Sequence, residues 1–300
     1  MTPISLSGEV ADAVNSGRPV VALESTILSH GLPPGRNRDV ADRVERTVRD
    51  AGAVPATIAV LDGRPVVGLS SAELDRVCAA DAGLDKLSLR DLGPAVGLRR
   101  SGATTVASTS ALAHAAGIGV FATGGLGGVH VGAAESWDVS ADLGALSRIP
   151  TLVVCSGVKS VLDIPATLEV LETASVPVLG YRTDDFPAFY LRSSGHAVPW
   201  RVEDPAQVAA VVSAHRCYSG SGVLLANPVP AESEMDRELH DRLLAEGLEL
   251  VRGNQVSGKD VTPVLLEHFH SASGGVSLDA NEALVLSNAR LAAQVAVELA

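Results

Sequence analysis

Lysine is rare in this chain of 300 residues, so its three occurrences are candidates for chemistry. Of the 23 basic side chains, twenty are arginine, and the lysines are Lys86, Lys159 and Lys259. Only a lysine amine can lose its proton and attack a carbonyl carbon, because a guanidinium stays charged at any working pH. A coding bias toward arginine would also leave few lysines, and this remains the alternative explanation.

Lys159 has the most suggestive surroundings of the three. It closely follows the β-branched run 151–154 and the polar segment 155–157, and an apolar helical segment comes after it. Partial burial in such a place favours the neutral, nucleophilic amine. Lys86 is a candidate positive partner for a bound anion.

Glu24 is the candidate for proton transfer. It comes directly after the valine-rich run 19–23, which is typical of a buried strand. Desolvation at the end of a strand raises the pKa of a carboxyl group, which suits a proton donor near neutral pH. The alternative is a structural carboxylate bonded to Ser25, to Thr26 or to a helix N-terminus.

Five hydroxyl side chains lie within residues 104–110, where the pattern predicts the start of a helix. Unpaired N–H groups, hydroxyls and the positive end of the helix dipole together form a natural phosphate site. Ordinary capping of the helix by one serine or threonine is the alternative.

A glycine-rich segment and an acidic segment follow each other near the middle of the chain. Four glycines lie within residues 124–128, and His130 comes soon after. They indicate a tight turn or close approach of the backbone to a ligand. Asp138 and Asp142 would share a face if their segment were helical. Carboxylates favour Mg²⁺ or Mn²⁺, which would keep several waters here; an acidic helix start is the alternative.

Segments typical of strands alternate with segments typical of helices along the whole chain. The pair Asp62-Gly63 between two apolar runs predicts a β-hairpin, and Ser70 with Glu73 predicts a capping box. The alternation predicts an α/β fold with three layers, α/β/α, and a mostly parallel or mixed central sheet. We expect a single domain over residues 1–300, with its chemistry at the carboxyl ends of the strands.

The individual elements are predicted from periodicity and from turn residues. The expected strands are 19–23, 56–61, 65–69, 86–90, 119–123, 151–154, 176–179 and 222–226; the expected helices are 108–116, 164–173, 205–215, 232–246, 262–269 and 281–299.

Composition narrows the class of protein. The net charge of −12 and the scattered arginines argue against nucleic-acid binding, which needs phosphate neutralisation. Apolar runs end well short of the length that spans a membrane. The cysteines, Cys78, Cys155 and Cys217, are odd in number and lack metal-site spacing. Together with an N-terminus that does not resemble a secretory signal, they predict a cytoplasmic protein with reduced thiols.

Taken together, these segments resemble the pseudouridine-5′-phosphate glycosidase family, also named after indigoidine synthase A. The motifs are colinear and span nearly the whole chain. They are ALESTI (22–27), PATIA (55–59), GATTVAST (102–109), FATGGLGGVH (121–130), DVSADL (138–143), CSGVKS (155–160), GYRT (180–183), FPAFY (186–190), ANP (226–228) and LDAN (278–281).

The resemblance implies reversible cleavage of pseudouridine 5′-phosphate to uracil and ribose 5-phosphate by a homotrimer that uses a divalent metal, usually Mn²⁺. By motif position, Lys159 matches the nucleophile that attacks C1′ of the sugar, Glu24 the proton donor and Asp138 the metal ligand. The positions that match substrate-binding residues are Lys86, Val106, Ser140, Ala141, Asp142, His130 and Asn281.

Two other functions remain open from the residues themselves. A Schiff-base aldolase acting on a sugar phosphate would use the same lysine and show no dependence on uracil. A module that binds a sugar phosphate or a nucleotide without turnover is the other alternative.

Overall fold

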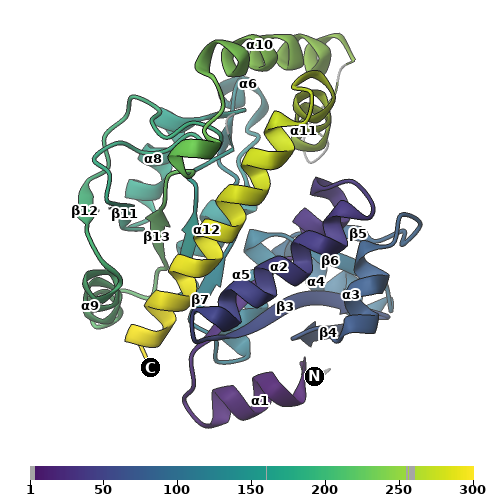
Figure 1. The fold of residues 1–300 in the computed structure, drawn as a ribbon, viewed down its shortest axis with the longest axis vertical. Coiled ribbons are helices and arrows are strands. Elements are labelled where there is room, and N and C mark those ends of the chain that lie inside the picture. Colours follow the sequence, from purple (N-terminus) through teal and green to yellow (C-terminus); the bar gives the residue numbers. More distant parts are fainter. Residues whose placement is uncertain (1–3, 160, 255, 257–260) are drawn as a thin grey trace.

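The computed structural model describes residues 4–159, 161–254, 256 and 261–300 (Figure 1). Lys259, whose role the sequence leaves open, lies outside the described residues.

Within the described residues, eleven strands form one mixed sheet in which most neighbours are parallel. The main path through the sheet is β1-β4-β3-β2-β7-β9-β13-β11-β12, and β6 joins β5 to β3. The strands are β1 Ser5–Leu6, β2 Val20–Leu23, β3 Val54–Leu61, β4 Arg64–Val67, β5 Asp85–Leu87, β6 Gly102–Thr104, β7 Val120–Ala122, β9 Leu152–Cys155, β11 Val178–Tyr181, β12 Trp200–Val202 and β13 Val223–Ala226. A separate antiparallel pair is formed by β8 Val129–His130 and β10 Leu162–Asp163.

Helices cover both sides of the sheet, which confirms the three-layer α/β prediction. They are α1 Gly8–Asn15, α2 Arg36–Asp50, α3 Ser71–Cys78, α4 Leu92–Gly97, α5 Val106–Ala115, α6 Ala133–Ser136, α7 Ala141–Leu146, α8 Ile164–Thr173, α9 Pro205–Arg216, α10 Arg237–Gly253, α11 Val261–Ala272 and α12 Val276–Glu298. Shorter turns are the π-helical η1 Ile27–Gly31 and the 3-10 turns η2 Leu89–Asp91 and η3 Ala231–Ser233. No helix in these ranges is both long and apolar enough to cross a membrane.

The long helix α12 crosses the middle of the molecule beside α2 (Figure 1). It packs on the central strands β2, β7 and β9, whose side chains are buried. The carboxylate of Glu282 on α12 is almost buried and pairs with Arg36 and Arg43 of α2. These ion pairs fix the two helices side by side over the strands that lead to the site.

Most predicted elements are present, with a few informative differences. The hairpin forms at Asp62 and Gly63, which both have positive φ, and Ser70 and Glu73 form the predicted capping box. The strand expected at 86–90 ends at Leu87, because Ser88 is the N-cap of η2, which begins at Leu89.

The acidic segment is not one continuous helix. It breaks between α6 and α7, where Trp137 adopts a left-handed conformation. Asp138 lies in this break and Asp142 lies on α7, so the two carboxylates do not share a helix face. The condition under which they would share a face, a helical segment, is therefore not met, because the turn at Trp137 separates the two short helices.

Four parallel neighbours, β2, β7, β9 and β13, place their carboxyl ends along one edge of the sheet. The residues that follow these strands are Glu24, Thr123, Ser156 and Asn227. Residues far apart in sequence therefore meet at this edge, as expected for an α/β fold.

Candidate active site

Two adjoining cavities at this edge share Glu24, Thr26, Lys86 and Lys159. The larger one, here called the polar cavity, has a volume of about 310 Å³. The smaller one, here called the inner cavity, has a volume of about 50 Å³. Both predicted catalytic residues therefore line one continuous site, although they are 135 residues apart in the chain.

Glu24 is held by a hydroxyl at the end of β7, the strand that pairs with β2 in the sheet. The Thr123 hydroxyl donates a hydrogen bond to its carboxylate. The hydroxyls of Ser25 and Thr26 donate instead to the carbonyls of Ile58 and Thr104, so they are not the partners of Glu24. This arrangement pins the end of β2 to β3 and β6, and it leaves Glu24 facing the cavities.

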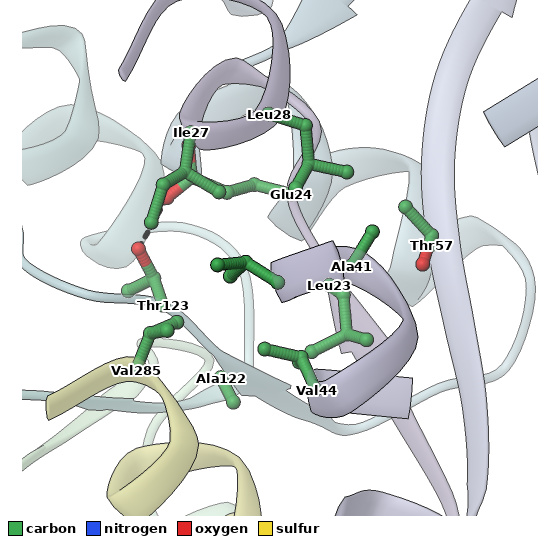
Figure 2. A pocket seen from close by; sticks show the side chains of 11 residues that line it. Leu23, Glu24, Ile27, Leu28, Ala41, Val44, Thr57, Ala122, Thr123 and Val285 are labelled. Carbon is green, nitrogen blue, oxygen red and sulfur yellow. Dashed lines mark hydrogen bonds between the residues drawn. The ribbon is translucent and has the colours of Figure 1, made fainter. Parts of the chain in front are cut away.

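An apolar pocket lies on one side of Glu24 (Figure 2), lined by aliphatic side chains that include Leu23, Leu28, Val44 and Val285. Burial raises the pKa of the Glu24 carboxyl above its ordinary value. The positive charge of Lys159 opposes this most strongly, followed by the hydrogen bond from Thr123, but burial has the larger effect. The raised pKa agrees with the expectation for a proton donor.

Lys159 lies in a loop that pairs in parallel with the glycine-rich segment at Leu126 and Val158. Its backbone N–H donates to the Leu126 carbonyl at 3.2 Å, and the Leu126 N–H donates to the Gly157 carbonyl at 3.0 Å. The backbone of the glycine-rich segment therefore holds the loop that carries Lys159 in place. Gly125 has to lack a side chain, because a Cβ there would lie 2.6 Å from the Phe189 ring.

The polar cavity has the features of an anion site. Lys86 and Arg90 supply positive charge, and Ser88, Thr105 and Ser140 supply hydroxyls. The first turn of α5 begins at its wall, where the N–H groups of a helix lack helical partners. A phosphate group fits this chemistry.

The expected substrate-binding residues Val106, Ser140, Ala141 and Asp142 all line the polar cavity. The Asp142 carboxylate also has a structural task, because it accepts hydrogen bonds from the N–H groups of Ala107 at 3.0 Å and Gly127 at 2.9 Å. Asp142 thereby ties the start of α5 to the glycine-rich segment.

Most of the hydroxyl cluster does not face the cavity. Thr104 donates to the Ile58 carbonyl, Ser108 donates to the Leu87 carbonyl, and Thr109 donates to the Thr104 hydroxyl. Ser110 is buried. Thr105 is the one member of the cluster that lines the polar cavity. The cluster therefore mainly anchors α5 to neighbouring strands, and Thr105 is its one contribution to the candidate anion site.

The inner cavity is more apolar and contains one polar group of interest. Ile27, Phe189 and Leu266 line it together with Asn281 of α12. Asn281 is only 3% exposed, and its Oδ1 has no hydrogen-bond partner among the described residues. A buried amide oxygen without a partner suits a ligand that offers an N–H group.

Asp138 and His130 lie together on the wall of the polar cavity, with the Nδ1 of His130 3.8 Å from the Oδ2 of Asp138. Burial lowers the pKa of His130, although the Asp138 charge opposes this. The described residues contain no group of three or more His, Cys, Asp or Glu side chains arranged to hold a metal. One carboxylate and one imidazole fit a cation that keeps most of its waters.

Several residues of the site carried no clear signal in the sequence. His30 lines the inner cavity, where its Nε2–H donates to the Leu84 carbonyl at 3.1 Å. Thr123 and Phe189 belong to segments noted for their motifs, without a role assigned to either residue. Only the pairing of distant strands brings them to Glu24 and Lys159.

The fold and the site define a class of α/β protein in which an amine and a carboxyl of raised pKa share a cleft with a candidate anion site. Residues 9–298 match the family model described as indigoidine synthase A like protein, and the chain belongs to this family.

The chain is 59% identical over 292 residues to a pseudouridine-5′-phosphate glycosidase of Salinispora tropica, an alignment that covers 96% of this chain and 90% of that protein. It is 53% identical to a protein of the same name from Streptomyces griseus, with 98% and 92% covered.

Two crystal structures are also similar. The prealnumycin C-glycosynthase AlnA in complex with ribulose 5-phosphate is 38% identical, with a TM-score of 0.92 and coverage of 100% of this chain and 97% of that one. An indigoidine synthase A-like protein from Thermotoga maritima is 38% identical, with a TM-score of 0.89 and coverage of 99% and 96%.

Proposed function

We propose that this protein is an enzyme that reversibly cleaves the C–C glycosidic bond of pseudouridine 5′-phosphate, giving uracil and ribose 5-phosphate. The observation that carries the proposal is the shared cleft of Lys159 and Glu24, with an anion site on one side and an unpartnered amide oxygen on the other. The names of the similar glycosidases agree with it.

The two cavities suggest how the substrate lies. The phosphate binds in the polar cavity near Lys86, Val106 and Ser140. The uracil lies in the inner cavity, where Asn281 accepts a hydrogen bond from a ring N–H. The ribose then lies between them, beside Lys159 and Glu24.

A carbon leaving group explains the need for an amine. Ordinary glycosidases use two carboxylates and protonate a leaving oxygen, and that scheme does little for a C–C bond. Here the Glu24 carboxyl donates its proton to the ring oxygen O4′ as the C1′–O4′ bond breaks. The Nζ of Lys159 bonds to C1′ and gives up a proton, which restores the Glu24 carboxyl.

The second stage separates the base from the sugar. Glu24 protonates C5 of uracil while the C1′–C5 bond breaks, and the nitrogen lone pair of Lys159 forms a C=N bond to C1′. Water then adds to this imine and releases ribose 5-phosphate and the free amine. Every proton is returned, so the cycle needs only substrate and water.

Asp138 would hold a divalent cation, Mn²⁺ in our proposal, with His130 beside it and water completing the shell. When bound, the cation would supply positive charge to polar groups of the substrate through its water ligands. Asp138 opens onto the polar cavity, which supports this placement.

We propose further that the protein is a cytoplasmic homotrimer. The three cysteines are free, which agrees with a reducing compartment. Trp137 is 85% exposed and Val131 is 56% exposed, and the two line one surface cavity together with Asp138. Exposed apolar side chains that lie close together support a contact between subunits.

The function is tested by incubating the purified protein and MnCl₂ with pseudouridine 5′-phosphate and measuring uracil and ribose 5-phosphate by chromatography. We expect both products in equal amounts. Unchanged substrate in the presence of the metal would overturn the proposal, and two carbonyl fragments without uracil would indicate an aldolase.

The role of the amine is tested in the same assay with Lys159→Arg. This variant keeps the positive charge and loses the nucleophile, so we expect no detectable product. Borohydride reduction with ribose 5-phosphate should attach the sugar to Lys159 of the wild-type protein, as mapped by peptide mass spectrometry. Turnover by the arginine variant would mean that the lysine serves only as a cation.

A further inference from the structure

Asn288 is a buried amide that the proposed mechanism does not use. It lies on α12, two helical turns after Asn281, and its side chain is 0% exposed. It points into the edge of the sheet where β7, β9 and β13 end, as its hydrogen bonds show. A buried amide at this place either supports the fold alone or positions the groups around it.

The amide joins the ends of all three strands. Its Nδ2 donates to the Thr123 carbonyl at 2.8 Å and to the Ser156 hydroxyl at 3.1 Å. Its Oδ1 accepts from the Nδ2 of Asn227 at 2.9 Å. Both hydrogens of the amide and its oxygen are therefore in use, which fixes the orientation of the side chain.

Two of these three contacts are with residues next to the proposed reacting groups. Thr123 is the residue whose hydroxyl donates to Glu24. Ser156 lies three residues before Lys159, and its N–H donates to the Gly124 carbonyl at 2.9 Å. A single amide thus holds the partner of the carboxyl and the start of the lysine loop in a fixed relation.

We infer that Asn288 is a positioning residue, which sets the separation between the Glu24 carboxyl and the Lys159 amine without touching the substrate. The inference rests on the proposed function. No other single natural side chain of this size offers two donors and an acceptor in a plane, so neither aspartate nor leucine can reproduce the contacts.

The test compares Asn288→Leu and Asn288→Asp with the wild-type protein. Small errors in the placement of reacting groups cost about 10²-fold in rate. We therefore expect kcat to fall about 10²-fold, with KM for pseudouridine 5′-phosphate changed less than about threefold. The rate at which borohydride traps ribose 5-phosphate on Lys159 should fall in parallel.

Val295→Ala serves as the matched control. Val295 is an apolar residue on the same helix, two turns after Asn288, and it is also 0% exposed. It should lower the melting temperature through a packing defect while kcat and trapping stay near wild type. Ser156→Ala, which removes one contact and leaves α12 unchanged, replaces the Asn288 variants if they do not fold.

The outcomes separate the inference from the proposed function. A wild-type protein that releases no uracil contradicts the function itself. If the wild type is active, two results contradict the positioning role alone. In the first, the Asn288 variants keep kcat and the trapping rate within about threefold of wild type. In the second, they lose no more of either than Val295→Ala does when its melting temperature falls by the same amount.

Discussion

Glu24 and Lys159, the proposed proton donor and nucleophile, have different surroundings. The carboxyl sits against aliphatic side chains, which raise its pKa by desolvation, and the amine reaches the same cleft from a loop held by backbone hydrogen bonds. The carboxyl has to be protonated to donate. The rate of bond cleavage should therefore decrease as the pH rises through the pKa of Glu24.

Thr123→Val should move this decrease to higher pH. The hydrogen bond from the Thr123 hydroxyl stabilises the ionised carboxylate of Glu24 and so lowers its pKa. Its removal raises that pKa further, and Glu24 stays protonated at higher pH. The check is kcat measured from pH 5 to 10; Thr123→Ser, which keeps the hydroxyl, should follow the wild-type profile. A shift to lower pH, or none, would contradict the assignment of Glu24.

At the residue scale, the sequence identified candidate residues where the residue type and its immediate neighbours were informative. The rarity of lysine pointed to Lys159, and the strand before Glu24 pointed to a buried carboxyl. Phe189, Thr123 and Asn288 could not be found in this way, because their importance comes from contacts across more than sixty residues of chain.

Among the elements, the loop after β9 contains a glycine that no other residue can replace without strain. Gly157 has φ +79°, and a Cβ there would collide with the backbone carbonyl of Pro187. A side chain at this position would be strained by the left-handed conformation. It would also clash with a backbone atom, which cannot rotate away as a side chain can. This element therefore depends on glycine for its path toward Lys159.

Gly157→Ala should lower the free energy of unfolding by at least about 1–3 kcal/mol, the usual cost of such strain. It should also reduce borohydride trapping on Lys159. Gly195→Ala is the matched control, because Gly195 has the same φ of +79° with nothing within 4 Å of an added Cβ. Denaturant unfolding of both variants provides the comparison; equal losses would mean that the Pro187 contact is unimportant.

Local signals predicted elements well where one short pattern decides the structure. The Asp62-Gly63 turn and the Ser70 capping box are of this kind. The acidic segment was different, because the sequence did not decide whether it is helical, and the left-handed turn at Trp137 depends on more than the local pattern. Strand order was also out of reach, since it depends on pairing between segments that no local pattern links.

At the scale of the whole molecule, the exposed Trp137 should lie in a contact between subunits. Trp137→Asp should therefore shift the protein from the mass of the proposed trimer, three times the 30.7 kDa of one chain, toward the single-chain mass. Sedimentation equilibrium measures this. Tyr218→Asp is the control, because Tyr218 is 90% exposed just after α9 and does not line the surface cavity that Trp137 shares with Val131. A wild-type monomer would rule out the trimer.

The position of α12 has a consequence for how the chain folds during synthesis. The helix packs on β2, β7 and β9, yet it follows β2 by about 250 residues. At typical translation speeds of about 5–20 residues per second, β2 is made roughly 10–50 s before the helix that covers it. The nascent chain should therefore be a substrate for ribosome-associated chaperones, and ribosome release should precede any activity.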